Sequence, residues 1–255
     1  MNCCNIQKPE WKQDDLSQAL RDGEHNVLVS SHNYKDIYDT LSKAYQIIQN
    51  SQNVFINVKP HDLIFSSILF IRARASLLAS IRLILAGQPI EAQPLLRLMI
   101  EQLWYGFYIA IDPKPPTRQK IWLDRNDSKE AKKKCKREFT IKNVRNCHEQ
   151  HDPVSADQLA KFYDSTIDYG AHPNQYSAFS QIKQDINSAS LKYEIGIYSF
   201  DIPVTMSSIR MTLGIVVGYL KILQIVFKDT FPEFVSENEI DELILNLNTQ
   251  FQRWA

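Results

Sequence analysis

Glycine is scarce in this chain, with only seven among 255 residues. Phosphate-cradling loops and tight β-hairpins both use glycine, so its scarcity argues mildly against Rossmann, P-loop and all-β folds. The sequence also contains no GxGxxG, GxxxxGK(S/T) or GxSxG run. Nucleotide-binding and hydrolase sites that depend on those motifs are therefore not expected.

A disulfide framework and a secretion signal are also missing. The four cysteines are Cys3, Cys4, Cys135 and Cys147. The opening run MNCCNIQKPEWKQDD has no apolar h-region, so free thiols in a reducing, cytoplasmic compartment are expected. Cys135 and Cys147 could join His148 and His151 in a tetrahedral zinc site. Because no C-x-x-C pair is present and Cys135 lies in a lysine run, we expect neither a metal site nor a cofactor.

An excess of charge is absent as well, since 29 Lys and Arg balance 29 Asp and Glu. Net neutrality argues against a dedicated nucleic-acid or membrane coat, although a local basic patch stays compatible with it. Two apolar segments, 63–86 and 211–227, resemble membrane spans, but the first contains three arginines and the second contains Lys221. A charge near a bilayer centre costs about 2.5–3.5 kcal/mol. Both segments are therefore predicted to be buried helices of a soluble bundle without membrane contact.

The spacing of apolar residues predicts helices through most of the chain. One helix is expected over 61–86, and Gly87 is placed to end it. A second begins between 89 and 94 and runs to Ile111, so the two form an αα-hairpin over 60–112. Further helices are expected at 34–52, 117–126, 128–145, 154–169, 204–227 and 237–254, with a loop at 147–153.

The remaining segments are less regular. Residues 1–33 are polar and predicted to be irregular, with one short helix around 15–21. Residues 175–202 are ambiguous, and 193–200 alternates weakly like a strand. The fold expected is all-α: one helical-bundle domain over 34–255 built around the hairpin, with a short irregular or weakly β insertion.

Arg97 and Glu101 lie four residues apart inside the apolar second helix of this hairpin. Such a pair stabilises a helix by only about 0.2–0.5 kcal/mol, and the order with the acid first is the better one. Arg97 is also close to the helix N-terminus, where positive charge is disfavoured. The pair therefore faces either water or another polar group. Arg72 of the preceding helix could supply that group, as a buried structural Arg–Glu–Arg network or as a cationic cleft for an anion such as phosphate.

His172 precedes Pro173 in the turn after Gly170, which places its imidazole at the end of a helix. An imidazole there could titrate near neutrality and act as a general acid or base. It could equally cap the last carbonyl groups of the helix. Both interpretations stay open.

Two runs, GQPIEAQPLLRLMIEQLWY (87–105) and FYDSTIDYGAHPN (162–174), resemble a widespread group of bacterial all-α proteins. That group shares an R-x-x-x-E helix, carried here by Arg97 and Glu101, and a later His-containing turn, carried here by His172. It is loosely similar to the HEPN superfamily (higher eukaryotes and prokaryotes nucleotide-binding), which includes metal-independent ribonucleases of toxin and antiviral systems. Those ribonucleases carry R-x(4–6)-H. Here the positions that match the Arg are 165–167, Ser-Thr-Ile, so Arg97 or Arg72 would have to supply the cation through space.

The run KEAKKKCKREFTIKNVR (129–145) holds eight basic residues against two acidic ones. It could track RNA phosphates through Lys133, Lys136 and Arg137, or it could be a solvated helix face. Gly214 and Gly218 allow close approach of helices, either in the core or in a homodimer contact.

Two hypotheses follow from these features. In the first, the protein binds RNA or a nucleotide and could be a ribonuclease. His172 is then the general acid or base, Arg97 and Arg72 stabilise phosphate charge, and Glu101 orients the arginines. In the second, it is a non-catalytic interaction or regulatory module in which the Arg/Glu network is structural.

Overall fold

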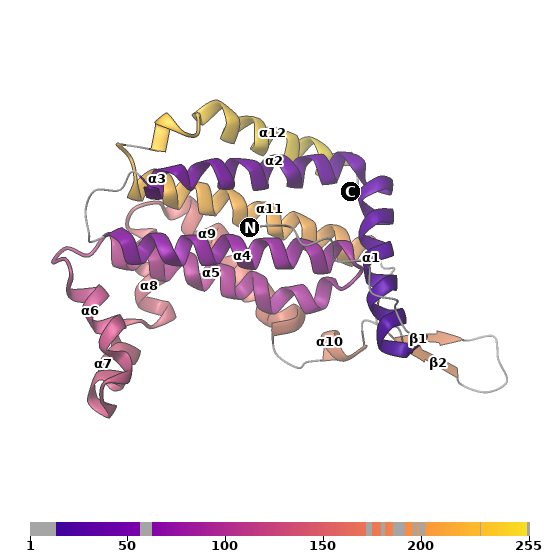
Figure 1. Cartoon of the computed structure of the whole chain (residues 1–255), viewed down its shortest axis with the longest axis horizontal. Coiled ribbons are helices and arrows are strands. Elements are labelled where there is room, and N and C mark those ends of the chain that lie inside the picture. The colour runs from indigo at the N-terminus through magenta and orange to yellow at the C-terminus, as the bar shows by residue number, and fades with distance from the viewer. Residues whose placement is uncertain are drawn as a thin grey trace, which may run out of the picture.

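The computed structural model describes residues 14–56, 63–171, 175–179, 182–185, 192–195, 198, 202–229 and 231–253. Long helices packed side by side account for most of these residues (Figure 1). The expected all-α bundle is therefore confirmed.

The αα-hairpin predicted from the sequence is present as α4 (Ile64–Leu85) and α5 (Pro89–Ala110). Gly87 adopts a φ of 86°, in the left-handed region where a residue without Cβ is favoured, and there the chain reverses. α5 begins at Pro89, the earlier of the two predicted starts, because proline suits the first turn of a helix. Pro94 lies inside the helix.

The central helix of the bundle is α11 (Ile202–Val226), which packs against both helices of the hairpin, α2 (Lys35–Ser51), α9 (Pro153–Thr166) and α12 (Glu237–Arg253). A Cβ on Gly214 would meet the Phe162 ring at 2.4 Å, and one on Gly218 would meet the Leu159 side chain at 2.8 Å. These two glycines thus let α9 approach α11 within the chain, as the core-packing interpretation expects. The stretch Pro203–Val226 is long and apolar enough to cross a membrane, but 61% of its apolar window is buried in the bundle.

The N-terminal part of the chain is more helical than predicted. α1 (Asp15–Asn33) is a 19-residue helix where an irregular segment with one short helix was expected. Asp14 caps it by accepting a hydrogen bond from Ser17 N at 2.9 Å. None of its residues is buried, which explains why the sequence has no helical apolar pattern there. A single turn, α3 (Asn53–Ile56), follows α2.

After the hairpin, α6 (Thr117–Leu123) and the 3-10 turn η2 (Asp124–Asn126) lead into α7 (Lys129–Glu138) and α8 (Ile141–Glu149). The prediction of one basic helix over 128–145 is wrong, because α7 ends at Phe139. That side chain is buried against Tyr105, Tyr108 and Trp122. Thr140 then caps α8 through a hydrogen bond from Asn143 N at 3.1 Å. Figure 1 shows α6 and α7 projecting from the bundle, and we call them the basic arm.

The loop predicted at 147–153 is shorter than expected, because α8 runs to Glu149 and Asp152 caps α9 through Ser155 N at 3.1 Å. α9 continues into a π-helical turn, η3 (Ile167–Ala171).

The insertion contains α10 (Gln175–Phe179) and two short antiparallel strands, β1 (Ile182–Asp185) and β2 (Lys192–Ile195). Ile182 pairs with Ile195 in their register. A weakly β insertion is thus confirmed, although most of the predicted strand after Ile195 lies outside the described residues. A 3-10 turn, η4 (Phe231–Glu233), connects α11 to α12.

Candidate functional site

The partner of the Arg97–Glu101 pair lies on α9. Arg97 Nε donates to Glu101 Oε1 at 3.0 Å, and the Tyr163 hydroxyl donates to the same oxygen at 3.1 Å. The Arg97 guanidinium also lies over the Tyr163 ring, 5.2 Å from its centroid. One carboxylate oxygen therefore connects α5 to α9 through two hydrogen bonds, and a cation–π contact supports them.

This cluster is only partly enclosed, since the side chains of Arg97 and Glu101 retain 26% and 27% of their exposure. Burial lowers the pKa of Arg97, but the hydrogen bond to Glu101 and the neighbouring charges outweigh it, so the net pKa is raised. Burial, and then the charge of Glu101, raise the pKa of the Tyr163 phenol. Arg97 is thus a permanent cation at the edge of the core.

Arg72 does not join this cluster. It is exposed on α4 and forms no ion pair within the described part of the chain. The hairpin contact at this level is instead a hydrogen bond of 3.1 Å from Ser76 Oγ to Gln102 Oε1. The suggested Arg–Glu–Arg network is therefore wrong, because Glu101 turns toward α9 and away from α4.

His172 lies outside the described residues, but the chain just before it is described. A Cβ built on Gly170 would lie 2.8 Å from the Ile90 carbonyl oxygen and 3.3 Å from Gln93 Cβ. Gln93 precedes Arg97 by one helical turn, so η3 crosses α5 next to the Arg97 cluster. Only a residue without a side chain fits this crossing.

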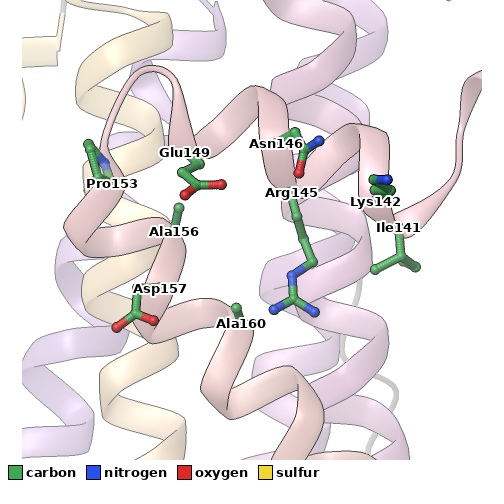
Figure 2. Close-up of a pocket in the computed structure, with 9 residues that line it drawn as sticks. All are labelled: Ile141, Lys142, Arg145, Asn146, Glu149, Pro153, Ala156, Asp157 and Ala160. Atoms are coloured by element: carbon green, nitrogen blue, oxygen red, sulfur yellow. The ribbon is translucent and has the colours of Figure 1, made fainter.

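A pocket of about 470 Å³ opens between α8 and α9, beside the same cluster (Figure 2). Its polar lining comprises Lys142, Arg145, Asn146, Glu149 and Asp157. Its apolar lining comprises Ile141, Pro153, Ala156 and Ala160. Figure 2 shows the two cations toward one side and the two carboxylates toward the other. The volume lies within the range of about 300–1,000 Å³ that is typical of small-molecule sites.

Arg145 links this pocket to the Arg97 cluster. Its Nη1 donates to Asp164 Oδ1 at 3.3 Å, and its guanidinium lies 5.8 Å from the centroid of the Trp104 ring. Trp104 in turn packs against Tyr163, with ring centroids 5.4 Å apart. Two arginines therefore flank one aromatic pair, Arg97 over Tyr163 and Arg145 over Trp104.

The basic arm carries the cations that the sequence assigned to anion binding. Lys133, Lys136 and Arg137 are all exposed on α7. So are the other cations of this helix, Lys129, Lys132 and Lys134. None of the six forms an ion pair with a described acidic residue. The face they form is therefore open to an anionic ligand.

The arm is fixed to α5 through polar contacts. Arg118 Nη1 donates to the Tyr108 carbonyl at 2.8 Å, and its guanidinium stacks 3.6 Å from the centroid of the Tyr108 ring. The Tyr108 hydroxyl donates to Glu138 Oε1 at 2.7 Å. Burial, followed by this hydrogen bond, raises the pKa of Tyr108 to about 12. The last turn of α7 is therefore attached directly to the hairpin.

The cysteine and histidine group behaves as part of the core. Cys135 and Cys147 are free, and burial raises the pKa of both thiols. His148 accepts a hydrogen bond from Trp104 Nε1 at 3.3 Å. Throughout the described ranges, no three His, Cys, Asp or Glu side chains gather closely enough to hold a metal ion.

No family model, no curated protein and no solved structure matches the chain.

The sequence alone identified Arg97, Glu101 and the cations of α7. It missed Tyr163 and Arg145, whose roles depend on the packing of α8 and α9 against α5. Tyr163 lies on the buried face of α9, where the sequence marks it as a core residue, and Arg145 is one of several cations in a basic run, so neither role has a signal of its own in the sequence.

Proposed function

We propose that this protein binds single-stranded RNA, with the basic arm as the contact for the phosphate backbone. The observation that carries the proposal is the set of six exposed cations on the ten-residue helix α7, none of them paired to a described acid. Cations arranged along one projecting element are the electrostatic pattern that phosphate binding requires.

The distribution of charge supports this reading. Residues 117–149 contain eleven Lys and Arg but five Asp and Glu, a net charge of +6. Since the whole chain is neutral, the remainder carries −6. This separation directs a polyanion toward the arm and away from the rest of the bundle. Net neutrality of the chain is therefore compatible with a localised polyanion site.

The pocket between α8 and α9 favours a single strand over a duplex. It follows the arm in the chain, and its volume suits one nucleotide. Lys142 and Arg145 can hold a phosphate, while the aliphatic wall offers a surface for a base. Glu149 and Asp157 can accept hydrogen bonds from hydroxyl or amino groups. The 2′-hydroxyl is such a donor, and it distinguishes RNA from DNA.

Binding is tested by fluorescence anisotropy with a labelled single-stranded RNA and the DNA of the same sequence. The triple variant Lys133→Gln/Lys136→Gln/Arg137→Gln should bind RNA at least tenfold more weakly. The slope of log K against log salt concentration should become shallower by about 2, since each phosphate contact on a single strand contributes about 0.7 to that slope. The matched control Lys35→Gln/Lys43→Gln/Lys228→Gln removes the same charge from exposed positions elsewhere. Equal losses in both triple variants would contradict the proposal.

The pocket has its own variant in this assay. Arg145→Gln should weaken RNA binding, whereas Lys43→Gln, at an exposed position of α2 outside the pocket lining, should not. If Arg145→Gln binds RNA like the wild-type protein while the triple variant binds it weakly, the arm binds RNA without the pocket.

A second candidate function, cleavage of the bound RNA, is favoured by the packing of Gly170 beside Gln93. Gly170 precedes His172 by two residues in the chain, and Gln93 precedes Arg97 by one helical turn on α5. In the reaction, His172 accepts the proton of a 2′-hydroxyl, and that oxygen attacks the adjacent phosphorus. The P–O5′ bond breaks, the 5′-oxygen takes up a proton, and a 2′,3′-cyclic phosphate forms. Arg97, oriented by Glu101, stabilises the developing charge. This chemistry is also what the resemblance to HEPN ribonucleases implies.

Cleavage is tested with end-labelled RNA in the presence of a chelator. The wild-type protein should release fragments that end in a cyclic phosphate, and His172→Ala should abolish cleavage while it retains RNA binding. Cleavage that survives His172→Ala would rule out this mechanism. Binding without any cleavage by the wild-type protein would identify a non-catalytic RNA-binding module, the alternative function.

A further inference from the structure

The outer face of α4 carries an exposed apolar stripe. Its residues are Ile64, Ile68, Ile71, Ala75 and Leu78, and we call them the α4 stripe. The four larger side chains retain 49%, 48%, 41% and 52% of their exposure in chain order. Soluble proteins scatter single exposed apolar residues, but a continuous row of this length marks an interaction surface.

The spacing within the stripe indicates what shape of partner it accepts. Its members recur at intervals of four, three, four and three residues, the alternation of the seam positions in a coiled coil. Arg82 continues the same series by four more residues. The inner face of α4 is filled by the core, with Phe70, Ala73 and Leu77 fully buried. The helix therefore presents two seams, and only the inner one is covered by the described residues.

The charges around the stripe indicate the chemistry of the partner. α4 has three arginines and no acidic residue. Arg74 lies over the Tyr45 ring, 5.7 Å from its centroid, but Arg72 and Arg82 are exposed at the border and the end of the stripe. A second copy packed antiparallel through the same stripe would place the two Arg72 residues close to the two-fold axis. Like charges at such a position disfavour that pairing, and α4 has no carboxylate to offset them.

We propose that the α4 stripe is a docking surface for an amphipathic helix of another protein, with apolar residues in heptad spacing and Asp or Glu beside them. Isoleucine and leucine side chains of α4 interdigitate with the apolar seam of that helix. Arg72 and Arg82 pair with its flanking carboxylates and fix its position.

The surface is independent of the proposed RNA contact. The stripe lies on α4, whereas the cations of the arm lie on α7 and the pocket lies between α8 and α9. RNA binding and helix docking can therefore be measured separately in the full chain. A negative result for RNA binding would leave the docking proposal unaffected, and the reverse also holds.

The probes are two synthetic 21-residue peptides with leucine at both seam positions of three heptads. They differ only in the flanking positions, which carry glutamate in one and lysine in the other. The full-length protein should bind the labelled glutamate peptide at least tenfold more tightly than the lysine peptide in a fluorescence anisotropy titration. Ile68→Ser/Ile71→Ser should lower that affinity at least tenfold. Arg72→Gln/Arg82→Gln should remove most of the preference for glutamate.

The matched control is Leu16→Ser/Leu28→Ser, which alters two side chains of α1 that are each 70% exposed. It should bind the glutamate peptide like the wild-type protein, and circular dichroism should show that both double serine variants remain folded. Equal binding of the two peptides, or binding of neither, overturns the proposal. So does a protein that sediments as a dimer and becomes monomeric in Ile68→Ser/Ile71→Ser, because the stripe then serves a second copy. Flotation of the protein with phosphatidylcholine vesicles, lost in the same variant, would assign the stripe to a lipid surface instead.

Discussion

Trp104 Nε1 donates a hydrogen bond of 3.3 Å to His148 Nδ1, and neither side chain is exposed to solvent. The other ring nitrogen of His148, Nε2, has no hydrogen-bond partner within the described residues. Its imidazole also packs edge-on against Phe107, with ring centroids 5.2 Å apart. Because the histidine accepts at Nδ1 and lies among aromatic rings, its neutral form is the one that the core accommodates.

Acid should therefore destabilise the fold through His148. Burial lowers its pKa from 6.5 to about 4, with a partly opposing effect of Asp152 and a smaller lowering by His151. The folded pKa is below the unfolded one, so this stabilisation is complete above pH 6.5 and is lost as the pH falls toward 4. The loss amounts to about 3 kcal/mol at 1.36 kcal/mol per pKa unit. Urea unfolding between pH 4 and pH 7 measures it.

The matched variants separate His148 from other acid effects. His148→Gln keeps an acceptor for Trp104 and does not titrate, so its stability should vary less over this range. His32→Gln, which alters an exposed histidine of α1, should follow the wild-type curve. Parallel curves for wild type and His148→Gln would show that this imidazole does not control acid stability.

Glu101 should couple Arg97 to Tyr163 energetically. Tyr163→Phe removes a hydrogen bond to a charged acceptor and should lower the free energy of unfolding by about 1 kcal/mol, given the residual exposure of Glu101. In a Glu101→Gln background the same change should cost less, since the acceptor is no longer ionised. A double-mutant cycle by urea denaturation measures the difference, and additive effects would mean that the two groups act independently.

Gly214 should be intolerant of any side chain. A Cβ there would lie 2.4 Å from the Phe162 ring, so Gly214→Ala should lower the free energy of unfolding by about 1–3 kcal/mol through overpacking. Gly218→Ala meets the flexible end of Leu159 and should cost less. Thermal and urea denaturation measure both. Phe162→Leu should restore part of the stability lost in Gly214→Ala. If it does not, the loss does not come from a clash with the Phe162 ring.

Glu138 should control how firmly the basic arm is attached. Glu138→Gln weakens the contact with Tyr108, and the carboxylate is 3.8 Å from Arg118 Nε. Amide hydrogen exchange in Lys129–Glu138 should therefore accelerate, with exchange in Pro89–Ala110 unchanged. Glu130→Gln, in the first turn of α7 and exposed, is the control. Equal protection of α7 in both variants would assign its attachment to the aromatic contacts of Phe139 alone.

The hairpin could be predicted from the sequence because its signals are local. Apolar residues recur with a helical period on both sides of Gly87, and glycine is the residue that tolerates the observed φ there. The position of Arg97 and Glu101 on one stripe of α5 follows from their spacing alone. Their partner could not be found this way, because Tyr163 is 62 positions beyond Glu101 and reaches it only through the packing of α9.

The errors have tertiary causes as well. The run 129–138 is rich in good helix formers, but Phe139 and Thr140 that follow are weaker ones. Burial of Phe139 among aromatic rings of α5 and α6, and capping of α8 by Thr140, end α7 there. The length of α1 was underestimated for the opposite reason: only a short helix around 15–21 was predicted, since a helix without buried residues leaves no apolar period in the sequence. Arg72 was paired with Glu101 on the basis of the hairpin alone, whereas the competing phenol of Tyr163 decides the direction of that carboxylate.

The end of α7 at Phe139 has a mechanical consequence. The C-terminal half of α7 is anchored to the body through the buried thiol of Cys135, the carboxylate of Glu138 and the ring of Phe139. Along α7 itself the charges are spaced by a rigid rod, and Lys129 and Lys136 are about 10 Å apart at 1.5 Å per residue. A flexible polyanion that binds along this helix must therefore match its phosphate positions to a fixed spacing of cations.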